Sequence, residues 1–314
     1  MARADSVGLS RTVPWLVTAA LVALVAATAD LGAMVEASRL ARLVPFVVCL
    51  VAASLAGMVY DGWCYALFFG RYVGPVGFAD GLRLRVASSL LAGFNYVAGQ
   101  ALVSLYVKKI VGAPFFKVAS VSILTIFVDT YLLALFATCG AWVAVPDMLE
   151  PILWIDAGFA VLGAAHFIFW LGGVDFFLLG FVREMNVCHA FRQSTLWDYI
   201  RVATLRVPTL LLDVLTVFVL LRCFGVNLPF WAVVATVPII DMVVFLPVTV
   251  AGLGSFHLAC RELFGSELGA PIPTVDAFAT LFLGLGLLLR VLVGLVGYRS
   301  LLARLNAPGA STDR

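Results

Sequence analysis

Arg290 is the residue of this chain whose position most strongly indicates chemistry. It lies near the middle of the unbroken apolar run 277–298. An arginine at the centre of a membrane-spanning helix costs at least ~2.5–3.5 kcal/mol, so a cavity, a buried carboxylate or an anionic ligand must compensate it. Other apolar segments supply suitable carboxylates, namely Asp129, Asp213 and Asp241. Asp129 and Asp213 fall in mid-span, where each could pair with Arg290, carry a coupling proton, or do both. The pattern predicts a polar site inside the membrane, with a structural ion pair as the simpler alternative.

Polar residues in two interrupted apolar stretches form a second set of candidates. Asn95 and Gln100 could hydrogen-bond a lipid phosphate or sugar, or could instead satisfy backbone groups and join helices. Lys108 and Lys109 suit an anionic head group at the cytoplasmic surface, unless they serve only as topology determinants. His257 could titrate near neutral pH, although a lone histidine is more often a hydrogen-bonded structural residue.

The composition places the chain among polytopic membrane proteins. Apolar residues make up 63% of the 314 residues and charged residues only 12%, whereas globular domains carry about 25% charged residues. No polar stretch is long enough for a sizeable soluble domain, so we expect residues 1–314 to form a single integral membrane domain. The net charge of +2 is too small to indicate a nucleic-acid partner.

The sequence lacks the common motifs of catalysis and cofactor binding. The Gly-x-Gly at Gly252 and Gly254 follows no strand and precedes no Lys-Ser/Thr, and no Walker pattern occurs, so we expect no ATP site. There is no G-x-S-x-G and no H-E-x-x-H, and the three histidines are spread over three segments. The six cysteines are scattered, and we expect free thiols. We therefore expect neither an enzyme nor a bound metal or cofactor.

Long apolar segments define an all-α polytopic fold. Each segment supplies the ~20 residues that a tilted helix needs to cross a bilayer. Two further stretches are interrupted by glycine and proline, which loosen helices, and we expect them to be broken hairpins. Asp61 and Asp175 lie nearer the ends of their segments, and we expect them to face the membrane interface. The expected spans are 13–29, 43–70, 115–143, 152–180, 203–224 and 276–303, and the expected hairpins are 87–107 and 228–265.

The distribution of basic residues predicts the topology. Loops 71–86, 108–117 and 181–206 are basic, whereas loop 144–156 is acidic. Since basic loops remain in the cytoplasm, the first hairpin must enter and leave on the cytoplasmic side. The same reasoning places both termini in the cytoplasm, and the second hairpin then enters and leaves on the outer side. Two opposed hairpins indicate an inverted repeat with a substrate site near the midplane.

Several of these residues resemble a known family pattern. Asn95 and Gly99-Gln100 in a broken segment, followed by Lys108 and Lys109, are similar to the Asn, Gly-Glu and basic residues of the flippase-like membrane domain of lysylphosphatidylglycerol synthases. The resemblance covers residues 10–305 and includes further blocks of that family: the segment from Gly112 to Asp129, the hairpin with Pro247, Gly252 and Gly254, and Arg290.

The chain departs from that family at a few positions. Gln100 and His257 stand where the family has glutamate, and Ile126 stands where it has arginine. The family's soluble aminoacyl-transferase domain is missing, so we do not expect aminoacylation of lipid.

The resemblance implies an integral protein of a bacterial cytoplasmic membrane that moves a phospholipid or lipid-linked head group between leaflets. Arg290 would meet the phosphate, Asn95 and Gln100 would hydrogen-bond the head group, and Asp129 or Asp213 would balance charge in the empty site. Membrane lipids that bear phosphate are the expected partners. The sequence leaves open a membrane-embedded lipid-phosphate transferase, a non-transporting scaffold for a lipid-modifying enzyme, and a homo-oligomer.

Overall fold

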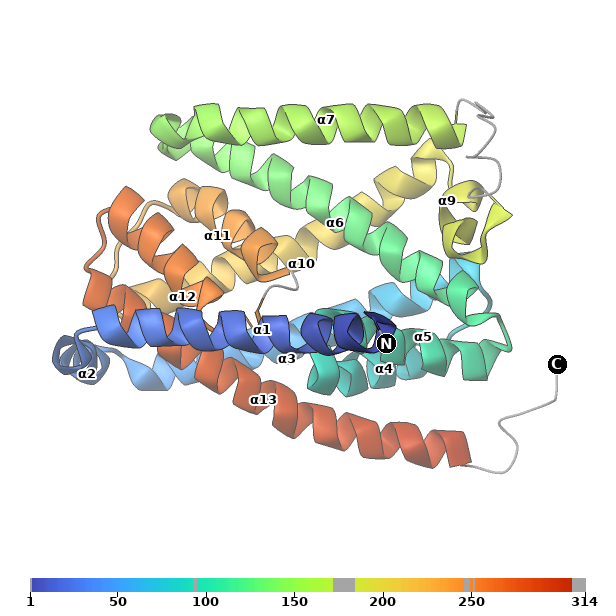
Figure 1. Ribbon diagram of the computed structural model, residues 1–314, viewed down its shortest axis with the longest axis horizontal. Coiled ribbons are helices and arrows are strands. Elements are labelled where there is room, and N and C mark those ends of the chain that lie inside the picture. Colours follow the sequence, from blue (N-terminus) through green and yellow to red (C-terminus); the bar gives the residue numbers. More distant parts are fainter. Residues whose placement is uncertain (1, 93–94, 172–183, 246–248, 251, 307–314) are drawn as a thin grey trace.

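The fold is all α-helical and carries several helices long and apolar enough to cross a membrane (Figure 1). The structure is a computed structural model that describes residues 2–92, 95–171, 184–245, 249–250 and 252–306. These described residues contain five helices that qualify as spans, or six if one bent pair counts as a span. The prediction of an all-α polytopic membrane protein is confirmed.

The long helices agree closely with the expected spans. Four of them have 28 to 35 residues, namely α3 (Leu43–Tyr72), α6 (Phe115–Ala144), α10 (Leu196–Cys223) and α13 (Ile272–Asn306). At 1.5 Å per residue they reach about 42–52 Å, which exceeds the ~30 Å of a hydrocarbon core.

Several helix boundaries differ from the sequence predictions. The first span is one helix, α1 (Ala2–Thr28), followed by α2 (Leu31–Leu40) at a bend of 82°. The 3-10 turn η1 (Pro146–Met148) leads directly into α7 (Leu149–Leu171), so the acidic stretch 144–156 is largely helical rather than a loop. The predicted part of this span beyond residue 171, including Asp175, lies outside the described residues.

Both predicted hairpins are present as short helices that are too short to cross alone. The first consists of α4 (Phe78–Ala92) and α5 (Tyr96–Val111), which have 15 and 16 residues. The second consists of α11 (Phe230–Phe245), the short α12 (Ser255–Cys260) and the π-helix η3 (Arg261–Glu267). A helix of 16 residues reaches about 24 Å, less than the hydrocarbon thickness. The first hairpin begins at residue 78 rather than 87, because stretch 78–86, predicted as a loop, is helical.

The two hairpins open at opposite ends of the molecule. The helices α3 and α10 that precede them are antiparallel, since the Arg42 amide donates to the Cys223 carbonyl at 2.9 Å and Arg71 pairs with Asp198 at 3.1 Å. The end of α3 therefore lies beside the start of α10. Figure 1 shows the same arrangement, with α4 and α5 toward the right end and α11 and α12 toward the left.

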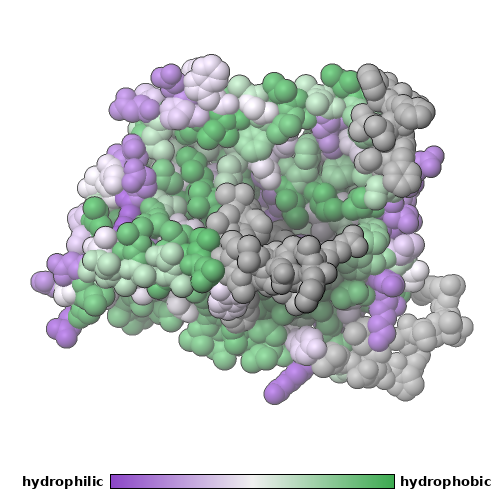
Figure 2. All heavy atoms as spheres, viewed as in Figure 1, coloured by the Kyte–Doolittle hydropathy of each residue, from purple (hydrophilic) through white to green (hydrophobic). Residues whose placement is uncertain are grey.

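Polar residues gather at these two ends. Figure 2 shows hydrophilic side chains mainly toward the left and right of the molecule and a broad hydrophobic surface between them. The end at which α5 finishes and α10 begins is called the basic end below. It carries Arg71, Lys108, Lys109, Arg192 and Arg201, all of them exposed.

The two halves of the chain pack on each other reciprocally. Each half consists of a long helix, a broken hairpin and a second long helix. The first hairpin helix α4 packs on α13 from the other half, and its counterpart α11 packs on α6. Glycine permits both close approaches: a Cβ at Gly140 of α6 would lie 2.3 Å from the Ala235 backbone nitrogen, and one at Gly297 of α13 would lie 2.8 Å from that of Ala87. This reciprocity is the packing that an inverted repeat produces.

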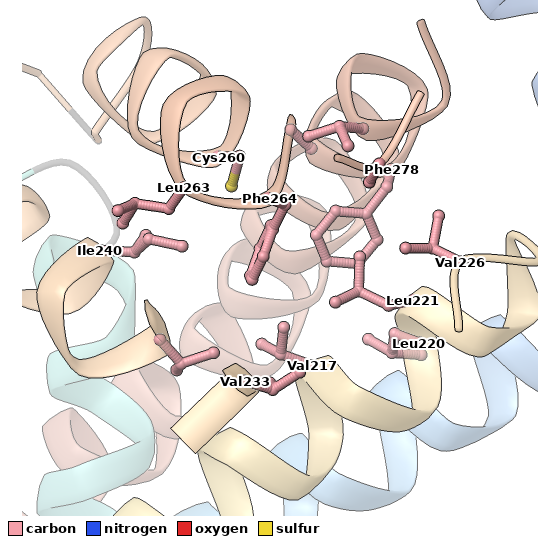
Figure 3. Packing of buried hydrophobic residues seen from close by; sticks show 14 of the residues in the cluster. Val217, Leu220, Leu221, Val226, Val233, Ile240, Cys260, Leu263, Phe264 and Phe278 are labelled. Atoms are coloured by element: carbon pink, nitrogen blue, oxygen red, sulfur yellow. The ribbon is translucent and has the colours of Figure 1, made fainter. Parts of the chain in front are cut away.

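Two apolar clusters form the core, one toward each end. The cluster at the end opposite the basic end surrounds Phe264 and Phe278, which are fully buried beside Leu220 and Leu221 (Figure 3). The cluster at the basic end includes Tyr72 and other residues of α3, α5, α6 and α10.

Candidate functional site

Arg206 is the centre of a buried ionic cluster. Its Nε donates to Asp129 Oδ1 of α6 at 2.7 Å, and its Nη1 donates to Asp61 Oδ1 of α3 at 2.7 Å. Only 13% of the Arg206 side chain is exposed. The sequence placed Arg206 at the end of a basic loop, but α10 begins at Leu196, so Arg206 lies in the third turn of the helix.

A second arginine completes this cluster. Arg85 of α4 donates from Nε to Asp61 Oδ2 at 2.8 Å, so the two Asp61 oxygens accept from two different guanidinium groups. Thr209 adds a weaker hydrogen bond of 3.3 Å to Asp61 Oδ1. Asp61 is 6% exposed, and the prediction that it faces the interface is wrong. Asp61, Arg85, Asp129 and Arg206, here called the paired cluster, join four helices.

Three further charges, one each on α10, α11 and α13, have no partner of this kind among the described residues. Asp213 of α10, Asp241 of α11 and Arg290 of α13, here called the unpaired group, make no ion pair within 4.0 Å in the part of the chain that the structure describes. The prediction that Asp129 could pair with Arg290 is wrong, because Arg206 occupies that carboxylate.

The unpaired group nevertheless occupies one region. Arg290 lies close enough to Asp213, Asp241 and Arg85 for their charges to interact with its guanidinium group. The Ser89 hydroxyl, one turn after Arg85 on α4, donates to the Arg290 carbonyl at 3.4 Å. Asp213 and Arg290 are both exposed, and Asp241 is half-buried. The unpaired group therefore does not lie in a packed core.

The candidates in the first hairpin have local roles in this structure. Asn95 is the N-cap of α5, and its Oδ1 accepts from the Ala98 amide at 3.0 Å. This is the alternative in which a polar side chain satisfies a freed backbone group. Gln100 is half-buried and faces the Tyr65 hydroxyl. Lys108 and Lys109 are exposed in the last turn of α5.

His257 belongs to a second ionic cluster at the end opposite the basic end. Its Nε2 lies 3.1 Å from Thr280 Oγ1 of α13. One turn later, Arg261 forms a bidentate pair with Asp276, with N–O distances of 2.5 and 2.6 Å. Arg261 also donates to Thr28 at the end of α1. This cluster ties α1 and the second hairpin to α13, and only 1% of the Asp276 side chain is exposed.

Two hollows open on the lipid-facing surface, and neither lies at the interior charges. One of about 600 Å³ is lined only by apolar and aromatic residues of α3 and by Phe78. The other, of about 560 Å³, lies between α6 and α7. Among the residues that the structure describes, no three His, Cys, Asp or Glu side chains gather in a way that could hold a metal ion.

Comparison with known proteins provides no basis for assigning a function. No family model matches the chain, and neither a curated protein nor a solved structure is significantly similar to it. The geometry of the interior charges is therefore the basis for assigning a function.

Proposed function

We propose that this protein moves phosphate-bearing lipid head groups across a bacterial cytoplasmic membrane along a path that passes the unpaired group. The observation that carries the proposal is the state of Arg290: a mid-span arginine that is exposed and forms no ion pair with a carboxylate among the described residues. An uncompensated charge in hydrocarbon costs several kcal/mol. Water or an anionic ligand must therefore reach Arg290.

The paired cluster shows that the absence of a carboxylate beside Arg290 is not a general feature of this helical bundle. Arg206 binds two carboxylates at 2.7 Å, so the bundle is able to neutralise an arginine where the fold requires it. Asp213 lies only seven residues beyond Arg206 on the same helix and takes no part in that cluster. Arg290 suits the phosphate of a head group, since guanidinium groups bind phosphate through charge-assisted hydrogen bonds. Asp213 and Asp241 suit its hydroxyl or amine donors.

The charge balance of the interior fits a transporter. Four carboxylates, two in each group, accompany three guanidinium groups, so the paired cluster and the unpaired group together carry one excess negative charge when fully ionised. A proton taken up with the substrate, or a positive group on the head group, would balance it.

The fold supports the same proposal. Opposed broken hairpins around a midplane site are typical of transporters built from inverted repeats, which alternate their access by moving one repeat against the other. The resemblance of Asn95, Gly99 and Arg290 to the flippase-like domain points the same way. The lipid chains would stay in the bilayer while the head group passes the unpaired group.

A transport assay tests this proposal. Purified protein in liposomes that contain a head-group-labelled phospholipid should move label between leaflets faster than protein-free liposomes, as measured by quenching of the outer leaflet. A chemically altered lipid product would support the transferase. Equal rates with and without protein would contradict transport and favour the scaffold.

The orientation can be tested separately. We propose that the basic end lies in the cytoplasm, because cytoplasmic ends carry an excess of lysine and arginine. Cysteines introduced at Arg83 and Lys109 should react with an impermeant reagent only from the cytoplasmic side. Labelling of the two positions from opposite sides would contradict the topology.

A further inference from the structure

A crevice on the outer side of α6 is separate from the charged interior. It has a volume of about 560 Å³ and lies between α6 and α7. Asp129 of α6 points to Arg206, whereas the next two residues line the crevice. Most of the lining is aromatic: Phe127, Thr130, Tyr131, Phe159, Leu162, Ala165, His166, Phe169 and Trp170.

We propose that this crevice binds one hydrocarbon chain of an anionic phospholipid from the leaflet at the basic end. The proposal does not depend on the transport function. The crevice is open to the lipid phase, because α7 packs mainly on α6 and leaves its other faces exposed, with Val161 at 70% and Leu162 at 63% exposure.

The length of the crevice fits a chain within one leaflet. Along α7 the lining extends from Phe159 to Trp170. Eleven residues of helix extend about 16 Å, roughly half of the ~30 Å hydrocarbon core. Because α7 ends at Leu171 near the basic end, the crevice occupies the half of the membrane that adjoins that end.

The two hydroxyls of the crevice and one ring nitrogen of His166 already have hydrogen-bond partners. The Tyr131 hydroxyl donates to the Phe159 carbonyl at 2.8 Å, and the Thr130 hydroxyl donates to the Ile126 carbonyl at 2.9 Å. His166 Nε2 lies 2.8 Å from the Tyr199 hydroxyl, and its ring stacks on Phe127 at 4.2 Å. An apolar chain can therefore fill the crevice without breaking a hydrogen bond, which favours a lipid tail over a head group.

Basic residues at the end of the crevice suit the head group of the same lipid. Trp170 stacks on Phe191 of α9 (His189–Gln193) with ring centroids 5.8 Å apart. The next residue, Arg192, is exposed. Arg192 and Lys117 both lie close enough to His189 for their positive charges to interact with its imidazole ring. A phosphate beside these cations would place the attached chain alongside Trp170.

Photocrosslinking tests the proposal on the intact protein. Phosphatidylglycerol with a diazirine in its acyl chain is reconstituted with the wild type, and the labelled peptides are mapped. Label should concentrate on the peptide that contains 159–170, and a matched phosphatidylcholine probe should label it less. Uniform labelling of all lipid-facing helices would overturn the chain site, and equal labelling by both probes would overturn the anionic head group.

A pair of variants isolates the crevice from the rest of α7. Ala165 lines the crevice and its neighbour Ala164 does not, although both side chains are exposed. Ala165→Trp should lower labelling about tenfold, which corresponds to displacing about two buried methylene groups, and Ala164→Trp should leave it unchanged. Equal labelling of two variants that melt like the wild type would overturn the site.

Discussion

Replacing Arg206 with methionine should destabilise the protein strongly. Methionine roughly keeps the length of the side chain and removes its charge. The variant loses two hydrogen bonds of 2.7 Å, one to Asp61 and one to Asp129. Asp61 keeps Arg85 at 2.8 Å, but Asp129 is left without an ionic partner at 10% side-chain exposure. Breaking a buried ion pair in this way costs about 3–5 kcal/mol, in line with about 1.5–3 kcal/mol for each hydrogen bond to a charged group.

The measurement is the unfolding free energy in mixed micelles at increasing denaturing-detergent fraction. Arg201→Met is the matched control, since Arg201 is exposed five residues earlier on α10. Such a surface substitution should change stability by no more than about 0.5 kcal/mol.

A double variant distinguishes the lost ion pair from lost packing. In Arg206→Met with Asp129→Leu, the abandoned carboxylate is removed as well, and an apolar replacement of a buried pair is often neutral. It should therefore recover a large part of the stability that Arg206→Met loses. Equal stability of Arg206→Met and Arg201→Met, or additive losses in the double variant, would refute the reasoning.

Three further predictions concern packing, the second ionic cluster and pH. Gly140→Leu should cost about 1–3 kcal/mol because its side chain would meet backbone, while Gly158→Leu, which meets nothing within 4 Å, should leave the melting temperature unchanged. Asp276→Asn should lower the unfolding free energy by about 3 kcal/mol, since it breaks a buried bidentate pair, and the exposed Asp147→Asn should not. Burial and the nearby cations lower the pKa of His189, so the unfolded chain takes up its proton first as the pH falls. The stability that His189 contributes should be present above pH ~6.5 and lost below it, and His189→Gln should show a smaller fall in melting temperature between pH 7 and pH 5.

The spans and hairpins could be predicted from the sequence because hydropathy, helix-breaking residues and loop charge can each be read from short stretches of the chain. Hydropathy locates α3 and α6 within two residues at each end. The glycine and proline breaks, together with the basic loops, were enough to predict two hairpins that open at opposite ends, and the antiparallel α3 and α10 confirm this.

The paired cluster could not be predicted, because the rule that basic loops stay in the cytoplasm treats basic residues beside an apolar segment as part of a loop. Arg85 and Arg206 were assigned to loops for this reason, yet both are helical. A signal for Arg206 was present: Thr195 and Asp198 form a capping box, which begins α10 at residue 196. The partnership with Asp61 depends on tertiary packing across 145 residues, which no local pattern encodes.

The initial rate of lipid translocation by Arg290→Met tests the central claim most directly. The control is Arg299→Met, which is likewise exposed on the same helix but lies near the basic end. Both are reconstituted at equal density with head-group-labelled phospholipid, beside the wild type and protein-free liposomes. The account predicts that Arg290→Met falls to the protein-free rate while Arg299→Met keeps the wild-type rate. Wild-type translocation by a folded Arg290→Met protein would contradict it.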